Sequence, residues 1–267
     1  MSVFQAFVLG IIQGLAEFLP ISSSAHLALT PWLLGWPEAG LAFDTSLHLG
    51  TLAAVLWYFQ EEWRRLAASA WELARTRQVT TESHRRVIFL IIATIPGGIA
   101  GLLLEDLAES IFRAPVVTGI ALIALGLLLW AVDRWAAHAR PLGTMQWRDA
   151  LLFGLAQVVA LVPGVSRSGA TMTMGRGLRF TREGAAVFSF LMSMPITFAA
   201  VAVKLPEAIR ERDVILPLIV GVVASGASGW LAISVLLKYV TRHSFGVFAV
   251  YRVILGAFVL ILLAIRE

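Results

Sequence analysis

The chain has 267 residues, of which 58% are hydrophobic and 14% charged, and its mean hydropathy of +0.82 excludes an ordinary soluble domain. The net charge is only +4 and the basic residues lie between apolar runs, so the pI near 10.1 does not indicate binding to nucleic acid. The sequence contains no cysteine, which excludes disulfides and thiolate metal sites.

Six apolar runs are long enough to cross a membrane. A helix needs about 20 residues to span roughly 30 Å of hydrocarbon, and the runs that qualify are 43–60, 87–104, 116–133, 184–203, 214–237 and 247–265. We therefore expect an all-α polytopic membrane protein in which residues 1–267 form a single integral membrane domain.

Two further apolar stretches, 3–35 and 149–178, are interrupted midway by the segments 20–24 (PISSS) and 163–171 (PGVSRSGAT). The pieces on either side of each interruption are too short to span the membrane comfortably. Irregular backbone is tolerated within a membrane only where it is buried in protein or lines water. The sequence therefore predicts two re-entrant helical hairpins in addition to the six transmembrane helices.

The two interrupted stretches also resemble each other. Five residues of the first recur at identical spacing in the second: Gly10, Gln13, Ala16, Ser22 and Ser24 match Gly154, Gln157, Ala160, Ser166 and Ser168. If three spans follow each hairpin, the odd number inverts the second repeat relative to the first. We expect inverted-topology repeats of approximately 1–134 and 149–267, with both hairpins near the membrane midplane. Chance similarity between helices rich in Gly, Ala and Ser is the alternative.

The charged connections predict how the chain is oriented. Arginines gather in 61–86, in 134–148 and in 176–182, and such residues favour the cytoplasmic side. The connection 105–115 is mostly acidic and suits the opposite side, whereas 204–213 carries both signs. Both termini are then expected outside the cytoplasm.

In the first hairpin, Gln13 and Glu17 are four residues apart and share one face if this stretch is helical. A buried glutamate needs a cation or a hydrogen-bond donor beside it. The following turn holds Ser22, Ser23, Ser24 and His26. These serines either cap the next helix or bind phosphate, and the two roles are compatible because a helix N-terminus offers free N–H groups to an anion.

In the second hairpin, Arg167 stands between Ser166 and Ser168, with Thr171 one turn on. Arginine within an apolar chain marks a functional site by default. Its planar fork of donors suits phosphate oxygens, and the hydroxyls add further donors. We expect a phosphate-handling site to which Gln13, Ser22, Ser24, Ser166, Ser168 and Thr171 contribute binding groups. Asp44 and His48 are either supporting partners of this site or the wet end of a helix.

The segments 13–26 (QGLAEFLPISSSAH) and 163–171 (PGVSRSGAT) resemble the two signature motifs of the bacterial undecaprenyl-diphosphatase family, also called bacitracin resistance proteins. The likeness covers nearly the whole chain in length, order of spans and position of motifs. It implies catalytic roles for Glu17, Ser23, His26 and Arg167. Gln13 stands where many members have Glu, and His48 where Gln is expected, so their roles stay open.

The resemblance implies hydrolysis of undecaprenyl diphosphate to the monophosphate and phosphate, which recycles the carrier lipid for peptidoglycan synthesis and underlies bacitracin resistance. It also implies a divalent cation, Mg²⁺ or Ca²⁺, for which Glu17 is the expected ligand. The expected location is the bacterial inner (plasma) membrane, with an active site open to the periplasm or the outside. A homodimer is a possible assembly.

The order of chemical events is left open by the sequence. We favour Ser23 as the nucleophile with His26 as its base, and the alternatives are attack by His26 itself or by a water that His26 activates. A transporter or flippase of a phosphorylated lipid is the alternative function, since inverted repeats with broken helices are common among transporters. A receptor or purely structural membrane protein would leave Arg167 unexplained.

Overall fold

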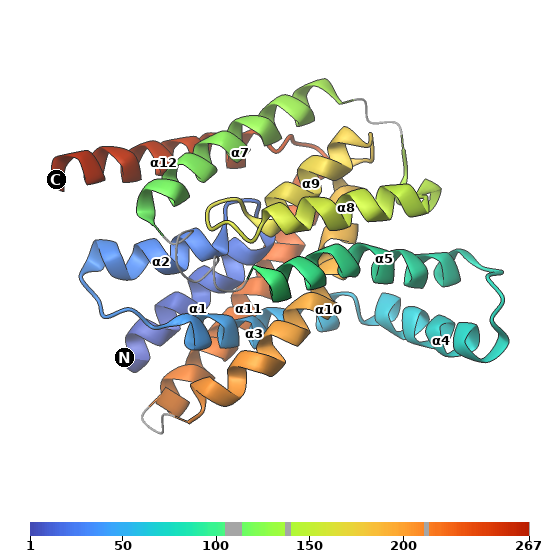
Figure 1. The fold of residues 1–267 in the computed structure, drawn as a ribbon, viewed down its shortest axis with the longest axis horizontal. Coiled ribbons are helices and arrows are strands. Elements are labelled where there is room, and N and C mark those ends of the chain that lie inside the picture. Colours follow the sequence, from blue (N-terminus) through green and yellow to red (C-terminus); the bar gives the residue numbers. More distant parts are fainter. Residues whose placement is uncertain (105–113, 137–139, 211–213, 267) are drawn as a thin grey trace.

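The computed structural model describes residues 1–104, 114–136, 140–210 and 214–266, and within these ranges the chain is all-helical apart from one isolated bridge between Arg140 and Phe180 (Figure 1). The helices of the first half are α1 (Val3–Phe18), α2 (Ser23–Leu34), α3 (Leu41–Tyr58), α4 (Gln60–Thr76), α5 (Glu82–Leu103) and α7 (Pro115–Trp135). Those of the second half are α8 (Trp147–Val159), α9 (Arg167–Gly177), α10 (Arg182–Ala208), α11 (Ile215–Val240) and α12 (Gly246–Arg266), with a short 3₁₀ turn at Leu142–Thr144.

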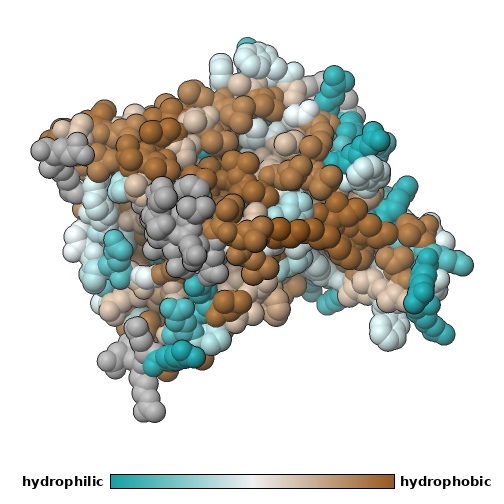
Figure 2. All heavy atoms as spheres, viewed as in Figure 1, coloured by the Kyte–Doolittle hydropathy of each residue, from teal (hydrophilic) through white to brown (hydrophobic). Residues whose placement is uncertain are grey.

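Five of the described helices are long and apolar enough to cross a membrane: α5, α7, α10, α11 and α12. They correspond to five of the six predicted spans. The sixth, 43–60, forms α3, an 18-residue helix that carries the polar residues Asp44 and His48 and is not among these five. Side chains on the outer faces of the five helices are largely apolar, and the face drawn in Figure 2 shows a broad brown area over α12, α7 and α5. The acidic residues predicted for the connection 105–115 (Glu105, Asp106 and Glu109) lie outside the described residues.

Each interrupted apolar stretch folds as two helices separated by a break at the predicted position. The first break lies between α1 and α2 and the second between α8 and α9. Ser22 and Ser166 end the two breaks with φ angles of 76° and 69°, a region that residues other than glycine seldom adopt. Each serine then caps the following helix, because its Oγ accepts a hydrogen bond from a backbone N–H three residues on, at Ala25 and Gly169 respectively.

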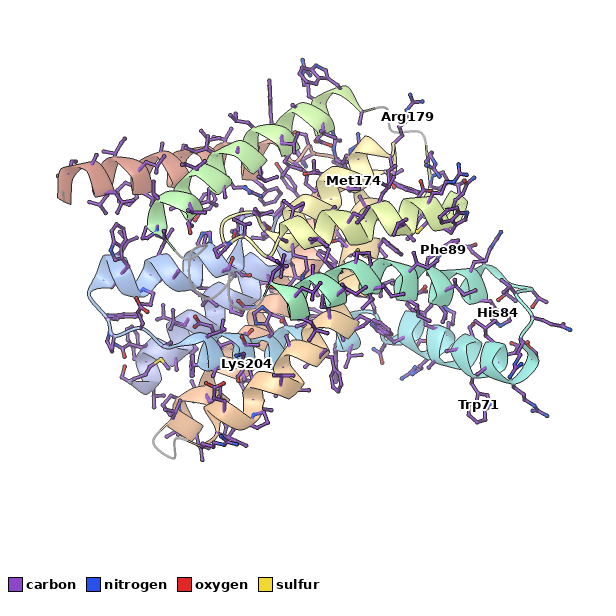
Figure 3. The ribbon with its side chains drawn as sticks, viewed as in Figure 1. Trp71, His84, Phe89, Met174, Arg179 and Lys204 are labelled. Carbon is purple, nitrogen blue, oxygen red and sulfur yellow. The ribbon has the colours of Figure 1, made fainter. Side chains whose placement is uncertain are left out.

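The charged segment 61–86, expected only as a connection, contains a regular helix. In α4, Trp63 and Leu66 lie on the side that packs against α5, while Arg64 and Arg65 pair with acidic residues on the exposed side. At the far end of this helical pair, Nε2 of His84 lies 3.3 Å from a carboxylate oxygen of Glu72. Figure 3 shows His84 between the two helices, whereas Trp71 points away from α5.

Glycines let the hairpins pack directly on neighbouring helices. A Cβ added to Gly10 of α1 would lie 2.2 Å from the Gly221 carbonyl oxygen of α11, and one added to Gly154 of α8 would lie 2.6 Å from that of Ala93 in α5. The end of α1 also packs edge-on through Phe18 against Phe190 of α10. These contacts fix the position of α1 against α11 and that of α8 against α5. They therefore also fix the positions of the breaks that follow α1 and α8.

A buried ion cluster anchors the far end of α9. Asp133 of α7 is 2% exposed and accepts hydrogen bonds from Nε of Arg176 at 2.7 Å and from Nε of Arg182 at 2.8 Å. The backbone N–H of Phe245 donates to the same carboxylate at 3.0 Å. Arg176, which the sequence placed among the basic connections, is therefore a buried structural residue rather than a solvated one.

Candidate active site

The two breaks end in the same way, although the first has four residues (19–22) and the second seven (160–166). In each, the capping serine lies 3.2 Å from the hydroxyl two residues on, which is Ser24 for Ser22 and Ser168 for Ser166. The breaks also touch, since Oγ of Ser168 donates to the carbonyl oxygen of Leu19 at 3.2 Å. Residues near the N-termini of α2 and α9 are thereby brought into one site.

Glu17, 8% exposed at its side chain, is the centre of this site. Its carboxylate forms an ion pair with Arg167, which is 150 residues away in the chain. It also accepts hydrogen bonds from Oγ of Ser23 at 2.7 Å and from Nε2 of Gln13 at 3.2 Å, and Nε2 of His48 lies 3.4 Å away. The predicted need of this glutamate for cationic and donor partners is thus met by four side chains, one each from α1, α2, α3 and α9.

Arg167 lies at the first position of α9, and Thr197 of α10 supports it. One guanidinium nitrogen binds Glu17, and the other donates to Oγ1 of Thr197 at 2.6 Å. The side chain of Arg167 is 23% exposed and lines a cavity of about 250 Å³. Its donors therefore face a space in which an anionic ligand can replace the glutamate.

The cavity gathers most of the predicted catalytic residues. Glu17, Ser23 and Arg167 line it, together with Ser24, Thr45, His48, Gly97, Gln157, Ala160, Leu161, Ser166, Ser168, Ile196, Thr197 and Ala200. A second cavity of about 300 Å³ shares Ser23, Ser24, Thr45 and His48 with it, and extends along α2 to Glu38 and Asp44. Polar groups are thus concentrated where the two hairpins meet.

His26 has different partners from those that the sequence favoured. Its Nδ1 lies 2.7 Å from the carbonyl oxygen of Ser22, and its Nε2 lies 2.6 Å from the hydroxyl of Tyr251 in α12. The two rings stack with centroids 5.6 Å apart. Ser23 hydrogen-bonds to Glu17, whereas the contacts of His26 in the structure are Ser22 and Tyr251. The role of His26 as the base of Ser23 stays a prediction.

The predicted binding residues divide into two groups. Ser24, Ser166 and Ser168 line the cavity, whereas Gln13, Ser22 and Thr171 are fully buried beneath it. Oγ1 of Thr171 donates to the carbonyl oxygen of Arg167 at 2.7 Å and lies 2.6 Å from the hydroxyl of Ser189. Thr171 therefore holds the first turn of α9 in place instead of facing a ligand.

Arg252 is a site residue that sequence reasoning missed. It lies in α12, is 0% exposed and donates to the carbonyl oxygens of Pro20 at 3.3 Å, Gly164 at 2.9 Å and Val165 at 2.8 Å. One guanidinium group thus hydrogen-bonds to both breaks and connects them. An isolated arginine in the apolar run 247–265 was the signal that could have revealed it, by the same reasoning that singled out Arg167.

The residues at the cavity fit a divalent cation only in a limited way. Within the part of the chain that the structure describes, no cluster of three or more His, Cys, Asp or Glu side chains is placed to hold a metal ion. Glu17 provides a carboxylate at the cavity, with His48 next to it. Such a donor set suits Mg²⁺ that is held by one carboxylate and by the phosphates of a substrate.

Comparison with known proteins gives a consistent result along the whole chain. The family described as bacitracin resistance protein BacA matches residues 6–258. The undecaprenyl-diphosphatase of Gemmatimonas aurantiaca is 64% identical over 266 residues, which cover 100% of both chains. Those of Pelotomaculum thermopropionicum and Desulforudis audaxviator are 49% and 45% identical, over 100% of this chain and 99% and 100% of theirs.

Proposed function

Because the chain belongs to the BacA family of bacitracin resistance proteins, we infer that it is an undecaprenyl-diphosphatase. It hydrolyses undecaprenyl diphosphate to undecaprenyl phosphate and inorganic phosphate, and so recycles the carrier lipid for cell-wall synthesis. The observation that carries the mechanism is the ion pair between Glu17 and Arg167, because it joins the two hairpins at a cavity lined with hydroxyls.

Binding of the diphosphate begins with Arg167. The guanidinium exchanges Glu17 for the non-bridging oxygens of the terminal phosphate, which its planar fork of donors matches. Thr197 keeps the guanidinium in place during this exchange, since it holds the other nitrogen. The free N–H groups at the start of α9 add further donors.

Ser23 is the nucleophile, and Glu17 is its base. The support is the 2.7 Å hydrogen bond from Oγ of Ser23 to Glu17, whose carboxylate is freed when Arg167 takes the phosphate. Oγ forms a bond to the terminal phosphorus while the bond from phosphorus to the bridging oxygen breaks. Undecaprenyl phosphate leaves with the electron pair, and the serine proton passes through Glu17 to it. Water then hydrolyses the phosphoserine.

A divalent cation, Mg²⁺ or Ca²⁺, supplies further positive charge for the diphosphate when it is bound. Glu17 is the residue that would hold it, with His48 as a neighbour. Arg167 remains the permanent cationic group of the site, and the two hairpins orient the lipid diphosphate toward Ser23. Among the described residues, Glu17 is the one carboxylate that lines this cavity, which is consistent with Gln13 replacing a second acidic residue.

The hairpins are re-entrant, and the chain is an inverted repeat of two halves, 1–134 and 149–267. The support is reciprocal packing: α1 packs on α11 of the other half, and α8 packs on α5. The matching serine caps at the ends of the two breaks agree with this symmetry. On this arrangement α3 is the sixth span, shorter and more polar because it borders the cavity through Thr45 and His48.

The protein lies in the bacterial inner (plasma) membrane with its active site open to the periplasm or the outside. The support comes from charge. Arginines cluster in α4 and at the start of α5, and arginines favour the cytoplasmic side of a membrane. The second cavity extends to Glu38, in the connection between α2 and α3, and to Asp44, near the start of α3.

Phosphate release from a C55 or C15 isoprenyl diphosphate by the purified protein tests the function. We expect release to be lost with EDTA and with Arg167→Ala, while the helical content stays unchanged. Binding of the lipid diphosphate without any release in the unmodified protein would support a flippase or transporter instead. Release that is unaffected by Arg167→Ala would remove Arg167 from the site.

A further inference from the structure

Gln157 carries an amide oxygen that has no hydrogen-bond partner among the described residues. The side chain belongs to α8, is 3% exposed and lines the active-site cavity with Glu17, Ser23 and Arg167. A buried polar atom without a partner destabilises a protein, and one at an active site calls for a functional explanation. The unpaired oxygen therefore indicates a ligand that donates a hydrogen bond.

Backbone contacts fix which way this amide faces. Nε2 of Gln157 donates to the carbonyl oxygen of Ala93 in α5 at 3.2 Å, so the acceptor Oε1 must lie at the other end of the amide. Two glycines allow the close approach. A Cβ on Gly97 would lie 2.6 Å from Nε2, and a Cβ on Gly154 would lie 2.6 Å from the Ala93 carbonyl oxygen. Helix packing thus holds the amide ready before any ligand enters.

The charge of the substrate decides what this oxygen binds. An amide oxygen only accepts hydrogen bonds, and the non-bridging oxygens of a diphosphate are acceptors as well. The donors of Arg167 suit those phosphate oxygens, whereas Oε1 of Gln157 suits water, which is the second substrate of any hydrolysis. We propose that Gln157 binds and orients the water that attacks phosphorus, an inference that rests on the diphosphatase function proposed above.

In the second step of that reaction, the oriented water acts on the phosphoserine at Ser23. Its oxygen forms a bond to phosphorus while the bond between phosphorus and Oγ of Ser23 breaks. One proton of the water passes to the Glu17 carboxylate, which returns a proton to Oγ, and the other stays on the released phosphate. Gln157 takes no proton. It restricts where the water oxygen lies, and such positioning is worth about 100-fold in rate.

Rapid-quench kinetics with undecaprenyl diphosphate separate this role from the others, because the lipid monophosphate and inorganic phosphate are measured independently. In Gln157→Leu we expect phosphate release to slow about 100-fold while the first equivalent of undecaprenyl phosphate forms at the unmodified rate. Phosphoserine should then accumulate, and KM should change little. Gln157→Met, which keeps the length of the side chain, gives the same measurement if the leucine variant does not fold.

Ser225→Ala is the matched control, since Oγ of Ser225 is also buried without a partner among the described residues but does not line the cavity. It should leave both products unchanged. The proposal would be overturned if Gln157→Leu slowed the formation of both products equally, or if it left the rate of phosphate release unchanged. It would also be overturned if raising Mg²⁺ restored the lost activity, because Gln157 would then be a cation ligand. Slow phosphate release without an adduct in any variant would keep the water role and remove Ser23 as nucleophile. Inactivity of the unmodified protein on all isoprenyl diphosphates would refute the diphosphatase function itself.

Discussion

Glu17 and Arg167 form an ion pair across 150 residues of sequence, each at the break of a different hairpin. Ser23 in the first half and Arg167 in the second hold the same place relative to the repeated serines, because each directly follows the capping serine. On the mechanism proposed above, the two halves place a nucleophile and a phosphate-binding cation at equivalent positions. The two breaks therefore carry different chemical groups, Ser23 and Arg167, at corresponding positions.

Replacement of Arg167 tests the ion pair. Arg167→Ala removes the donors for the phosphate, and we expect a fall of about 10²–10³ in kcat/KM. Arg167→Lys keeps the charge but loses the planar fork and the separate contact with Thr197, so it should restore less than about a tenth of the activity. Phosphate release assays on both variants give the answer. Full activity in the lysine variant would mean that charge alone is sufficient.

Ser23 and Ser24 form a matched pair of neighbouring hydroxyls at the cavity. Ser23→Ala should lower kcat by at least about 10³ because the nucleophile is lost. Ser24→Ala should lower it less than about tenfold, because the hydroxyl of Ser24 contacts that of Ser22 in the cap rather than Glu17. Acid-quenched protein incubated with β-³²P-labelled substrate should yield phosphoserine. Label found on histidine would contradict the assignment of Ser23.

We expect His26 to contribute through its contact with Tyr251 rather than through proton transfer. The hydrogen bond and the stacked rings tie α2 to α12. We expect Tyr251→Phe and His26→Gln each to lower the free energy of unfolding by about 1 kcal/mol and kcat by less than about tenfold. The double variant should show a coupling of the two losses, measured as a double-mutant cycle of thermal unfolding in detergent. A loss of activity in His26→Gln that Tyr251→Phe does not share would restore His26 as a catalytic group.

Arg252 should be needed for the shape of both breaks. Arg252→Met would leave the carbonyl oxygens of Pro20, Gly164 and Val165 without this partner, at a cost of about 1–3 kcal/mol each. We expect a clear fall in melting temperature together with lost activity. Arg242→Met, at an exposed position after α11, is the control and should change neither. If Arg252→Met melts like the unmodified protein, the guanidinium does not hold the breaks.

The sequence by itself determined those features that depend on local chemistry. Long apolar runs predict membrane helices because the bilayer leaves few other structures possible. The breaks at Pro20 and Pro163 and the caps at Ser22 and Ser166 follow from backbone chemistry within a few residues. Arg167 was identified because a cation in apolar surroundings requires a function. The helix α4 was missed, since its charged residues were taken for those of an irregular connection.

Only the tertiary structure decided which side chains meet. The sequence favoured Ser23 with His26 as its base, and in the structure Ser23 hydrogen-bonds to Glu17 while His26 contacts Tyr251. Thr197, Gln157 and Arg252 come from helices whose packing against the hairpins is set by long-range glycine contacts and buried charge. Such contacts depend on the free energy of the whole helix bundle, so no local sequence pattern specifies them. The partners of Glu17 are therefore decided only when both halves of the chain fold together.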